Sequence, residues 1–236
     1  MASRRDDGLV VTPAAVVQRC LVDPQHRDCP RTPTVYLTID DGPSSASTAD
    51  YLSMLTAHQV AATFFVTGHQ AAGQPHLLRQ IIDQGSTIGV HSWSHDYDLL
   101  YPDRVADPAQ IGSEVDRTLA ALRDALGPAF TTTTAFRYPG GHMSWQGMGP
   151  ADHALAKRGM SWVDWNALYG DAEPQERRPT TRKAMVKMAI TTAKAADNPT
   201  VVVLLHDGPT RGLSRAATPR VIDWFLEHGY RFGVID

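Results

Sequence analysis

The sequence predicts a single α/β domain built around a parallel β-sheet. From residue 34 onward, short apolar runs typical of strands alternate with longer segments of helical periodicity. Such strict alternation indicates parallel strands joined by right-handed helical crossovers. A chain of 236 residues with 42% apolar residues is long enough to form one large core.

Seven segments are predicted as strands. Each is a short run rich in apolar and β-branched residues, bounded by turn residues or by polar clusters. The most apolar of them ends at Leu205, as expected of a strand buried on both faces. The predicted strands cover residues 34–39, 61–66, 86–90, 133–137, 160–164, 200–205 and 231–235.

Six helices are predicted between these strands. Ser47 is a suitable N-cap for the first helix, and Pro108 stands at the first position of the third. The predicted helices cover residues 48–58, 74–84, 108–126, 150–158, 180–197 and 214–228.

A closed barrel and an open doubly wound sheet both fit this alternation. An open sheet concentrates its chemistry at one switch point, whereas here polar clusters follow five of the strands. Neither G-x-G-x-x-G nor a Walker-type phosphate loop occurs. The positions of the polar clusters therefore favour a barrel, in which all strands open on the face that carries the active site.

Residues 1–33 are predicted to be an N-terminal extension on the surface of a domain that covers residues 34–236. The extension is polar and looks irregular, apart from a short apolar run. Its cysteines, Cys20 and Cys29, lie in Pro-containing sequence outside the expected core. A disulfide between them would stabilise the fold by roughly 2–3 kcal/mol and would indicate an oxidising compartment. Two free thiols are the alternative.

Composition and charge argue against two classes of partner. A net charge of −3 gives no basic footprint for nucleic acid. No apolar run approaches the roughly 20 residues of a transmembrane helix. The first residues contain no apolar signal segment, which fits either a trimmed form of a secreted protein or a genuine cytoplasmic start.

Two adjacent carboxylates, Asp40 and Asp41, end the first predicted strand and precede Gly42. Like charges repel one another and Asp is a weak strand former, so this local conflict is of the kind expected at a functional site. A simple turn is the alternative, because Asp-Gly-Pro is good turn chemistry. A cation beside the pair would remove the conflict.

Two histidines, His91 and His95, follow the third predicted strand. Their spacing would bring both imidazoles to one side of a helical turn, a common arrangement of metal ligands. With one carboxylate of the Asp pair they would form the three-ligand set of a catalytic zinc-type site. The second carboxylate is then a candidate general base, which together with a metal-activated water indicates a hydrolase.

Further candidates follow other strands. His206 ends the most apolar strand and is a candidate general acid. Arg137 should pair with a carboxylate and hold its orientation. Gly140 and Gly141 allow close approach of the backbone, so that an N–H can face an oxyanion. Trp165 suits stacking on a sugar ring. No G-x-S-x-G motif is present, so a serine hydrolase is unsupported.

These clusters, in this order, resemble the five motifs of the polysaccharide deacetylase family, also known as carbohydrate esterase family four, over residues 34–236. The resemblance implies a distorted (β/α) barrel of about seven parallel strands and a metal-dependent hydrolase that acts on linear amides. The family's roles fall by position on these residues: Asp40 as base, His206 as acid, Arg137 and Asp171 as the residues that orient them, Asp41, His91 and His95 as metal ligands, and Tyr138, Gly140, Trp165 and Leu204 as the lining of the substrate groove.

The chain departs from the commonest family pattern at two motifs. The third motif, usually Arg-x-Pro-Tyr, reads Arg-Tyr-Pro-Gly at residues 137–140. The aromatic lining is therefore changed, and the N–H offered to an oxyanion would come from Gly140. In the fourth motif, Leu168 stands where an aspartate is common and Ala172 where a tryptophan is common.

Residues 94–102, 137–141 and 164–166 resemble the bacterial peptidoglycan N-acetylglucosamine deacetylases. The resemblance implies an acetylated polysaccharide substrate, peptidoglycan first, with chitooligosaccharides or acetylxylan as alternatives. A carbohydrate-binding module without turnover is a further alternative.

The expected cofactor is a divalent metal, Zn²⁺ or else Co²⁺ or Ni²⁺. We expect a monomer that is secreted or associated with the cell wall. If the N-terminus is genuine, the alternative is a cytoplasmic deacetylase of a small acetylated metabolite, which free thiols at Cys20 and Cys29 would favour.

Overall fold

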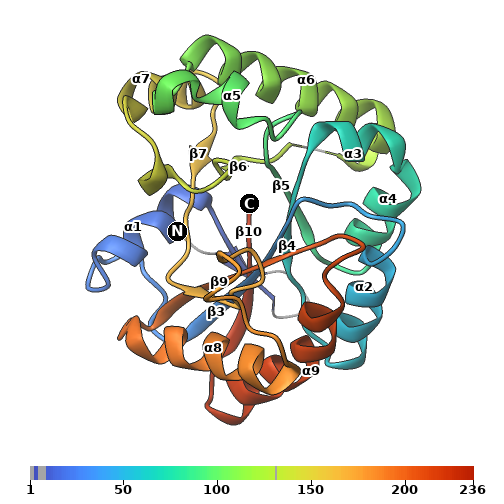
Figure 1. Cartoon of the computed structure of the whole chain (residues 1–236), viewed down its shortest axis with the longest axis vertical. Helices are drawn as coiled ribbons and strands as arrows, with labels where there is room; N and C mark the ends of the chain where they lie inside the picture. Colours follow the sequence, from blue (N-terminus) through green and yellow to red (C-terminus); the bar gives the residue numbers. More distant parts are fainter. Residues whose placement is uncertain (1–2, 5–8, 131) are drawn as a thin grey trace.

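One mostly parallel sheet surrounded by helices makes up the computed structural model, which describes residues 3–4, 9–130 and 132–236. In this part of the chain the sheet has ten strands, and each strand pairing is parallel except the one between the first two. Figure 1 shows the strands at the centre of the ring of helices. The prediction of a single α/β domain is confirmed.

The seven predicted strands are all present, and three short ones were not predicted. The strands are β1 (Ser3–Arg4), β2 (Val10–Thr12), β3 (Thr34–Asp40), β4 (Thr63–Val66), β5 (Thr87–Val90), β6 (Ala135–Phe136), β7 (Ser161–Trp162), β8 (Ala167–Leu168), β9 (Thr200–His206) and β10 (Arg231–Ile235). Two of the predicted strands, 133–137 and 160–164, form ladders over only two residues each.

The six predicted helices are present with small changes at their ends. The α-helices are α1 (Ala14–Val22), α2 (Thr48–Ala57), α3 (Gly68–Gly73), α4 (Pro75–Asp83), α5 (Tyr97–Leu100), α6 (Pro108–Leu126), α7 (Met148–Ala156), α8 (Arg182–Ala195) and α9 (Gly212–Glu227). Short 3₁₀ turns are η1 (Pro102–Arg104), η2 (Gly127–Ala129) and η3 (His142–Ser144). No helix in the described part of the chain is long and apolar enough to cross a membrane.

The sheet curves into a distorted barrel around β3. One edge of β3 pairs over its whole length with β9, and the other edge pairs first with β10 and then with β4. The ladder continues from β4 through β5 and β6 to β7, while β8 pairs with β9. β7 and β8 do not pair with each other. They are consecutive parts of residues 161–168, so the chain itself connects the β6–β7 side of the sheet to the β8–β9 side.

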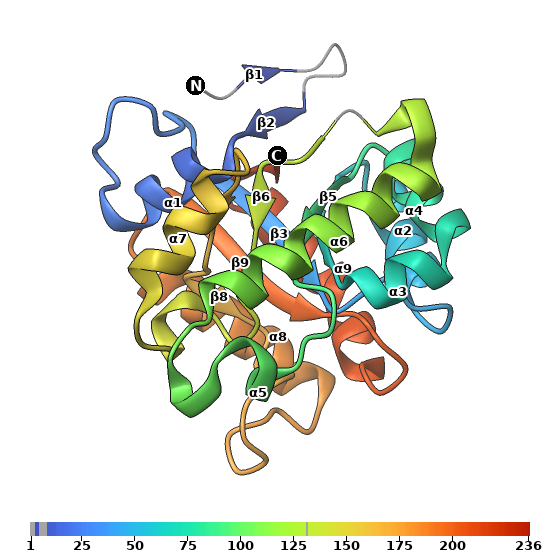
Figure 2. The ribbon, with the colours of Figure 1, turned by 90° about the horizontal axis from the view of Figure 1, so that it is seen from above.

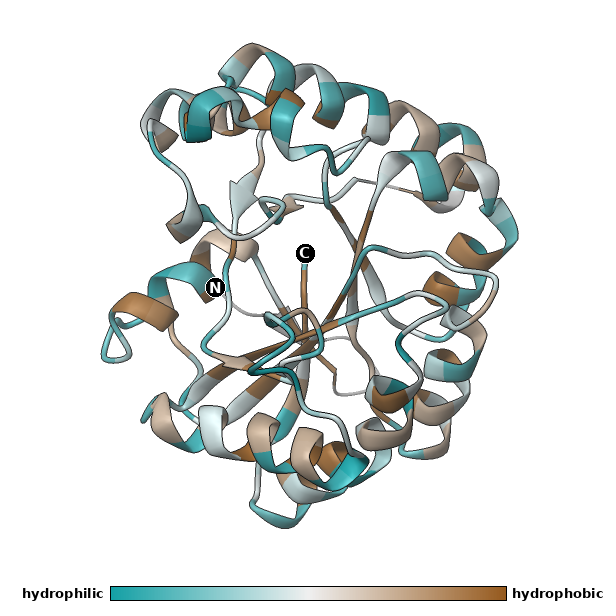
Figure 3. Ribbon diagram, in the orientation of Figure 1, coloured by the Kyte–Doolittle hydropathy of each residue, from teal (hydrophilic) through white to brown (hydrophobic). Residues whose placement is uncertain are grey.

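Alternate side chains of β3 pack in two different clusters. Val35, Leu37 and Ile39 belong to the large apolar cluster beneath the helices, whereas Tyr36 belongs to a separate cluster with residues of β4, β6, β9 and β10. Side chains of a strand alternate between its two faces, so Asp40 follows Tyr36 on the inner face. Figure 3 shows the apolar colour concentrated on the central strands.

The N-terminal segment is less irregular than its sequence suggests. It contains α1, whose Ala14 and Val17 pack in the inner cluster, and β2, which extends the sheet beside β10. Figure 2 shows β1 and β2 at the end of the barrel opposite α5. Apolar residues of the N-terminal segment are therefore part of the inner cluster. The proposed boundary between residues 1–33 and the catalytic domain stays a prediction.

The two cysteines form a disulfide, as favoured by the sequence. Contrary to expectation, Cys20 and Cys29 are buried, where they form a small cluster with Val16. The amphipathic pattern of α1 explains the difference, because it turns the face of Cys20 inward.

Replacing both Cys20 and Cys29 by Ala should lower the free energy of unfolding by about 2–3 kcal/mol, since the disulfide restricts the unfolded chain. Urea unfolding of the wild type and the double variant measures this difference. Val22→Ala, an exposed position at the end of α1, is the control and should leave the midpoint unchanged. Equal midpoints for all three proteins would contradict the expectation.

Candidate active site

A cavity of about 290 Å³ opens at the carboxyl ends of the barrel strands. Ten of the eleven site residues predicted from the sequence line it, and the eleventh, Arg137, lies fully buried beside them. The predicted residues that line the cavity are Asp40, Asp41, His91, His95, Tyr138, Gly140, Trp165, Asp171, Leu204 and His206.

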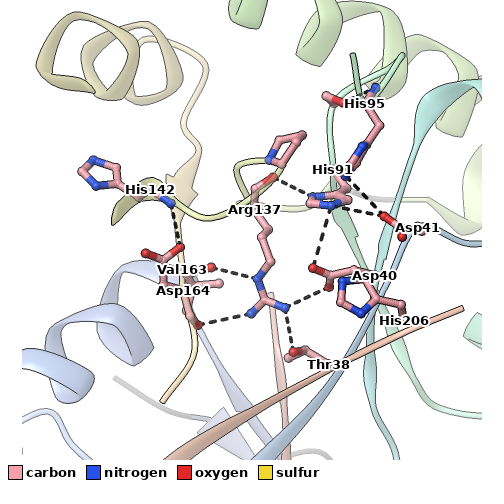
Figure 4. A network of polar contacts seen from close by, with 12 residues as sticks. Thr38, Asp40, Asp41, His91, His95, Arg137, His142, Val163, Asp164 and His206 are labelled. Atoms are coloured by element: carbon pink, nitrogen blue, oxygen red, sulfur yellow. Dashed lines mark hydrogen bonds and ion pairs between the residues drawn. The ribbon is translucent and has the colours of Figure 1, made fainter. Parts of the chain in front are cut away.

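Asp41, His91 and His95 converge on one point at the mouth of the cavity. Oδ1 of Asp41 lies 3.5 Å from Nε2 of His91 and 3.5 Å from Nε2 of His95. One possible ligand atom from each of the three side chains lies within 4.8 Å of the other two. Figure 4 shows the two imidazoles and the carboxylate directed toward one another. The three side chains therefore form a candidate metal centre.

The turn that carries the histidines is not helical, so the predicted helical turn is wrong. Ser92 and His95 both have a positive φ, and the N–H of His95 donates to Oγ of Ser92 (3.0 Å). The imidazole rings still meet, with centroids 4.9 Å apart.

Glu114 of α6 holds this turn from behind. Its buried carboxylate accepts hydrogen bonds from the N–H groups of Trp93 (2.9 Å) and Ser94 (3.1 Å) and from the hydroxyl of Ser94 (2.7 Å). Thr118, one turn further along α6, donates to the carbonyl of Ser92 (3.0 Å). A helix distant in sequence thus imposes a conformation that residues 91–95 would not adopt on their own.

His91 is held as a neutral imidazole. Its Nδ1 donates to the carbonyl oxygen of Arg137 (2.8 Å), which leaves Nε2 free to face Asp41. Burial, and then the neighbouring His95, lower the pKa of His91 to about 3. A neutral imidazole whose other nitrogen bonds to a carbonyl is the usual form of a metal-binding histidine.

Asp41 offers an oxygen with no partner of its own. It has a φ of 74°, a backbone conformation that is uncommon for a residue other than glycine. Its Oδ1 is buried and accepts no hydrogen bond in the described structure. A buried carboxylate oxygen between two imidazoles is the donor set that a divalent cation would satisfy.

The second carboxylate of the pair, Asp40, is buried and bound to Arg137. Nη1 of Arg137 donates to Oδ1 of Asp40 (2.9 Å) and to the hydroxyl of Thr38 (2.7 Å). Figure 4 shows the guanidinium between this pair and Asp164, whose carbonyl accepts from Nη2 (3.2 Å). Burial raises the pKa of Asp40, although the charge of Arg137 opposes the shift. Asp40 is therefore more basic than an ordinary carboxylate, and Arg137 fixes the orientation of its carboxylate.

His206 and Asp171 form a second paired unit across the cavity. Nδ1 of His206 donates to Oδ1 of Asp171 (2.8 Å), and Oδ2 of Asp171 accepts from the His206 N–H (3.0 Å) and the Ser214 hydroxyl (2.7 Å). Burial alone would lower the pKa of His206, but the Asp171 carboxylate outweighs it and raises the pKa. This imidazole is thus favoured in its cationic, proton-donating form.

The wall formed by the third motif differs from the commonest family pattern in a way that the structure explains. Gly140 has a φ of 79°, and a side chain at this position would approach the indole of Trp145 to 3.2 Å. Tyr138 faces the cavity from a buried position, where its hydroxyl donates to Asp152 (3.0 Å). An aromatic residue therefore still lines this wall, but from position 138 instead of 140.

Three buried acids near the site, Glu114, Asp164 and Asp207, were not predicted as site residues. Besides Glu114, Asp207 accepts hydrogen bonds from the hydroxyls of Ser47 and Thr48 and from the N–H of Gly208 (2.8 Å), and so ties the end of β9 to the segment after Asp41. The signal for Glu114 was available, because it lies on the apolar face of α6, three residues after Ile111. No comparable pattern marks Asp207.

Glu114→Ala should weaken Zn²⁺ binding by about 10- to 100-fold, because two N–H groups of the turn lose their acceptor and His95 is no longer held in place. Competition with a chelating dye measures the affinity. Asp116→Ala is the matched control, since Asp116 is an exposed acid of α6 that pairs with Arg158. Unchanged Zn²⁺ affinity in a folded Glu114→Ala protein would show that the turn does not need this anchor.

Known proteins resemble the chain in sequence and in structure. A chitooligosaccharide deacetylase from Bradyrhizobium sp. (strain ANU 289) is 34% identical over 195 residues, which cover 82% of this chain and 79% of the relative. A peptidoglycan-N-acetylglucosamine deacetylase from Bacillus cereus is 28% identical over 200 residues, 84% of each chain. The structure of a CE4 esterase from Streptococcus mutans superposes with a TM-score of 0.89 and 40% identity, covering 96% of this chain and 92% of the esterase.

The family model for polysaccharide deacetylases matches residues 27–147, which include the Asp pair, both histidines and Arg137. This match extends over about half of the chain, and the similarity to the relatives covers most of the remainder. The family predicted from the order of the motifs is confirmed: the chain belongs to the polysaccharide deacetylase family.

Proposed function

We propose that this protein is a metal-dependent hydrolase that removes N-acetyl groups from N-acetylglucosamine residues of peptidoglycan. The observation that carries the proposal is the juxtaposition, around one cavity, of a three-ligand centre, an aligned carboxylate and an imidazole paired with a carboxylate. These are the parts that amide hydrolysis requires: an electrophilic centre, a base and an acid.

The donor set suits Zn²⁺, for which Co²⁺ and Ni²⁺ are alternatives. Two neutral imidazoles and one carboxylate are typical protein ligands of a catalytic zinc ion, and they leave a position for water or substrate. The partnerless Oδ1 of Asp41 supports this assignment. When bound, such an ion would polarise the acetamide carbonyl and make water more acidic.

In the proposed reaction Asp40 acts as the general base. It takes a proton from water as the water oxygen attacks the carbonyl carbon, and Arg137 keeps its carboxylate directed toward the cavity. Gly140 lines the cavity, and its backbone N–H is the donor that we assign to the developing oxyanion. Leu204 would line the space for the acetyl methyl group.

His206 acts as the general acid in this proposal. As the carbon–nitrogen bond breaks, it donates its proton to the leaving amine, and the products are acetate and a glucosamine residue of the polymer with a free amine. Asp171 holds the imidazole by Nδ1, so that Nε2 carries the transferable proton. Trp165, which lines the cavity, would contact the sugar ring.

The polymer and the compartment are inferred from the relatives and from the disulfide. One relative is named for peptidoglycan and another for chitooligosaccharides, which makes chitooligosaccharides the second candidate and acetylxylan a third. The Cys20–Cys29 disulfide favours an oxidising compartment and hence a secreted or wall-associated protein. A monomer fits this proposal.

Acetate release by the Zn²⁺-loaded protein from peptidoglycan, chitin oligomers and acetylxylan tests the function. Asp40→Asn should lower turnover by at least about 100-fold with Zn²⁺ still bound, because the base is lost but the three ligands remain. His91→Ala should instead lose the metal. Asp50→Asn, an exposed acid that pairs with Arg215, is the control.

Either of two results would refute this assignment. Full activity of Asp40→Asn would exclude Asp40 as the base, and no acetate from any of the three polymers would exclude polysaccharide deacetylation. Identification of the sugar residue of the treated peptidoglycan that carries a free amine would distinguish glucosamine from muramic acid.

Asp171→Asn should move the alkaline limb of the pH profile to lower pH. A histidine with a raised pKa donates its proton below that pKa and loses this ability as the pH rises through it. Without the Asp171 charge the pKa of His206 falls, so activity is lost at a lower pH. The dependence of kcat on pH measures the shift. An unchanged alkaline limb would show that His206 is not the general acid.

A further inference from the structure

Exposed apolar side chains gather on two neighbouring segments, one of which carries a residue that lines the cavity. Among the described residues, four of the seven exposed large hydrophobic side chains lie on two segments: Tyr97, Leu99, Val105 and Met143. The two segments run side by side, because Ala106 donates to the Gln146 carbonyl and Gln146 to the Arg104 carbonyl, both at 2.9 Å. A concentration of exposed apolar groups beside a cavity is typical of a binding surface.

Tyr97 is the member of this group that also lines the cavity. It is 44% exposed, although its ring is held between two other rings. Its centroid lies 5.3 Å from that of His95 and 5.1 Å from that of Trp145, which it meets edge-on. A large aromatic surface is therefore presented to solvent at the edge of the candidate metal centre.

The rings behind Tyr97 are themselves fixed. Trp145 stacks on the buried ring of Tyr101 at 4.0 Å with an interplanar angle of 8°, and its Nε1 donates to the carbonyl of Pro139 (2.8 Å). Arg104 covers the same indole at 5.2 Å. Because this support is rigid, little conformational freedom of Tyr97 would be lost when a ligand packs on it.

The cavity is too small to hold a polymer. About 290 Å³ lies at the lower end of the range of roughly 300–1,000 Å³ for small-molecule sites. One acetylated sugar would occupy it, so the neighbouring sugars of a polysaccharide must lie on the surface around its mouth. Tyr97 lies at the edge of the cavity and offers an exposed aromatic ring to that surface.

We propose that Tyr97, supported by Trp145, forms a subsite that binds the sugar ring next to the one being deacetylated. This inference rests on the proposed function. The C–H groups of one face of a pyranose ring pack on an aromatic ring, and the hydroxyl groups at its edge remain hydrated. The subsite would make catalysis depend on chain length, because binding energy from a remote sugar helps to orient the reacting one.

The test compares N-acetylglucosamine oligomers of one to five residues as substrates of the Zn²⁺-loaded protein. For the wild type, kcat/KM should rise as the oligomer grows beyond a single sugar. Tyr97→Ala and Tyr97→Leu should reduce that rise by about fivefold, because the aromatic face is lost. Tyr97→Phe should retain it, since the ring remains.

Leu226→Ala is the matched control, because Leu226 is an exposed apolar residue of α9 that lies outside these two segments and does not line the cavity. Zn²⁺ affinity is measured for each variant, since Tyr97 adjoins His95. A wild type without dependence on chain length, or a Tyr97→Ala protein that keeps it, would overturn the subsite.

Failure of the proposed function gives a different result, namely no acetate from any oligomer. Calorimetric binding of the pentamer and the single sugar then decides the subsite independently of turnover. Binding of the pentamer that is tighter than that of the single sugar, and that weakens in Tyr97→Ala but not in Leu226→Ala, supports it. Equal affinities refute it.

Discussion

The buried guanidinium of Arg137 is the group on which both the barrel interior and the active site depend. It is fully inaccessible to solvent, rests 4.2 Å above the ring of Phe65, and donates to groups of β3 and of the segment after β7. Its charge is offset by Asp40 alone among the ion pairs of the described residues. Removal of either partner of such a pair leaves an uncompensated buried charge, at a cost of about 3–5 kcal/mol. The alignment of Asp40 and the packing of the strands are therefore coupled.

The same coupling explains how the end of β3 places two adjacent carboxylates, Asp40 in the strand and Asp41 just after it, in different surroundings. Asp40 follows the inner row of β3 and meets Arg137, whereas Asp41 turns outward through a positive φ toward the histidines. The segment after Asp41 is in turn tied to β9 by Asp207. The position of each acid thus depends on strands far apart in the sequence, which the pairing of β4 and β9 with β3 brings together.

Long elements and chemical clusters could be predicted from the sequence, whereas conformations imposed from a distance could not. The apolar runs of β3 and β9 and the periodicity of α6 gave clear signals, and the order of polar motifs indicated the family. The spacing of His91 and His95 suggested a helical turn. The actual turn is held by Glu114, about 20 residues away, and the local sequence does not reveal this contact. The helices α3 and α5 are too short to show a period, and β7 and β8 depend on partners in β6 and β9 rather than on local propensity.

The placement of the two ends of the described chain has a consequence for how the enzyme can be attached to other structures. β1 and the C-terminus lie on the side of the barrel opposite α5, as Figure 2 shows, and β2 pairs with both β1 and the C-terminal strand β10. A tether, tag or solid support joined at either end would face away from the cavity. The protein can therefore be immobilised with its working surface turned outward, toward a polymer too large to diffuse.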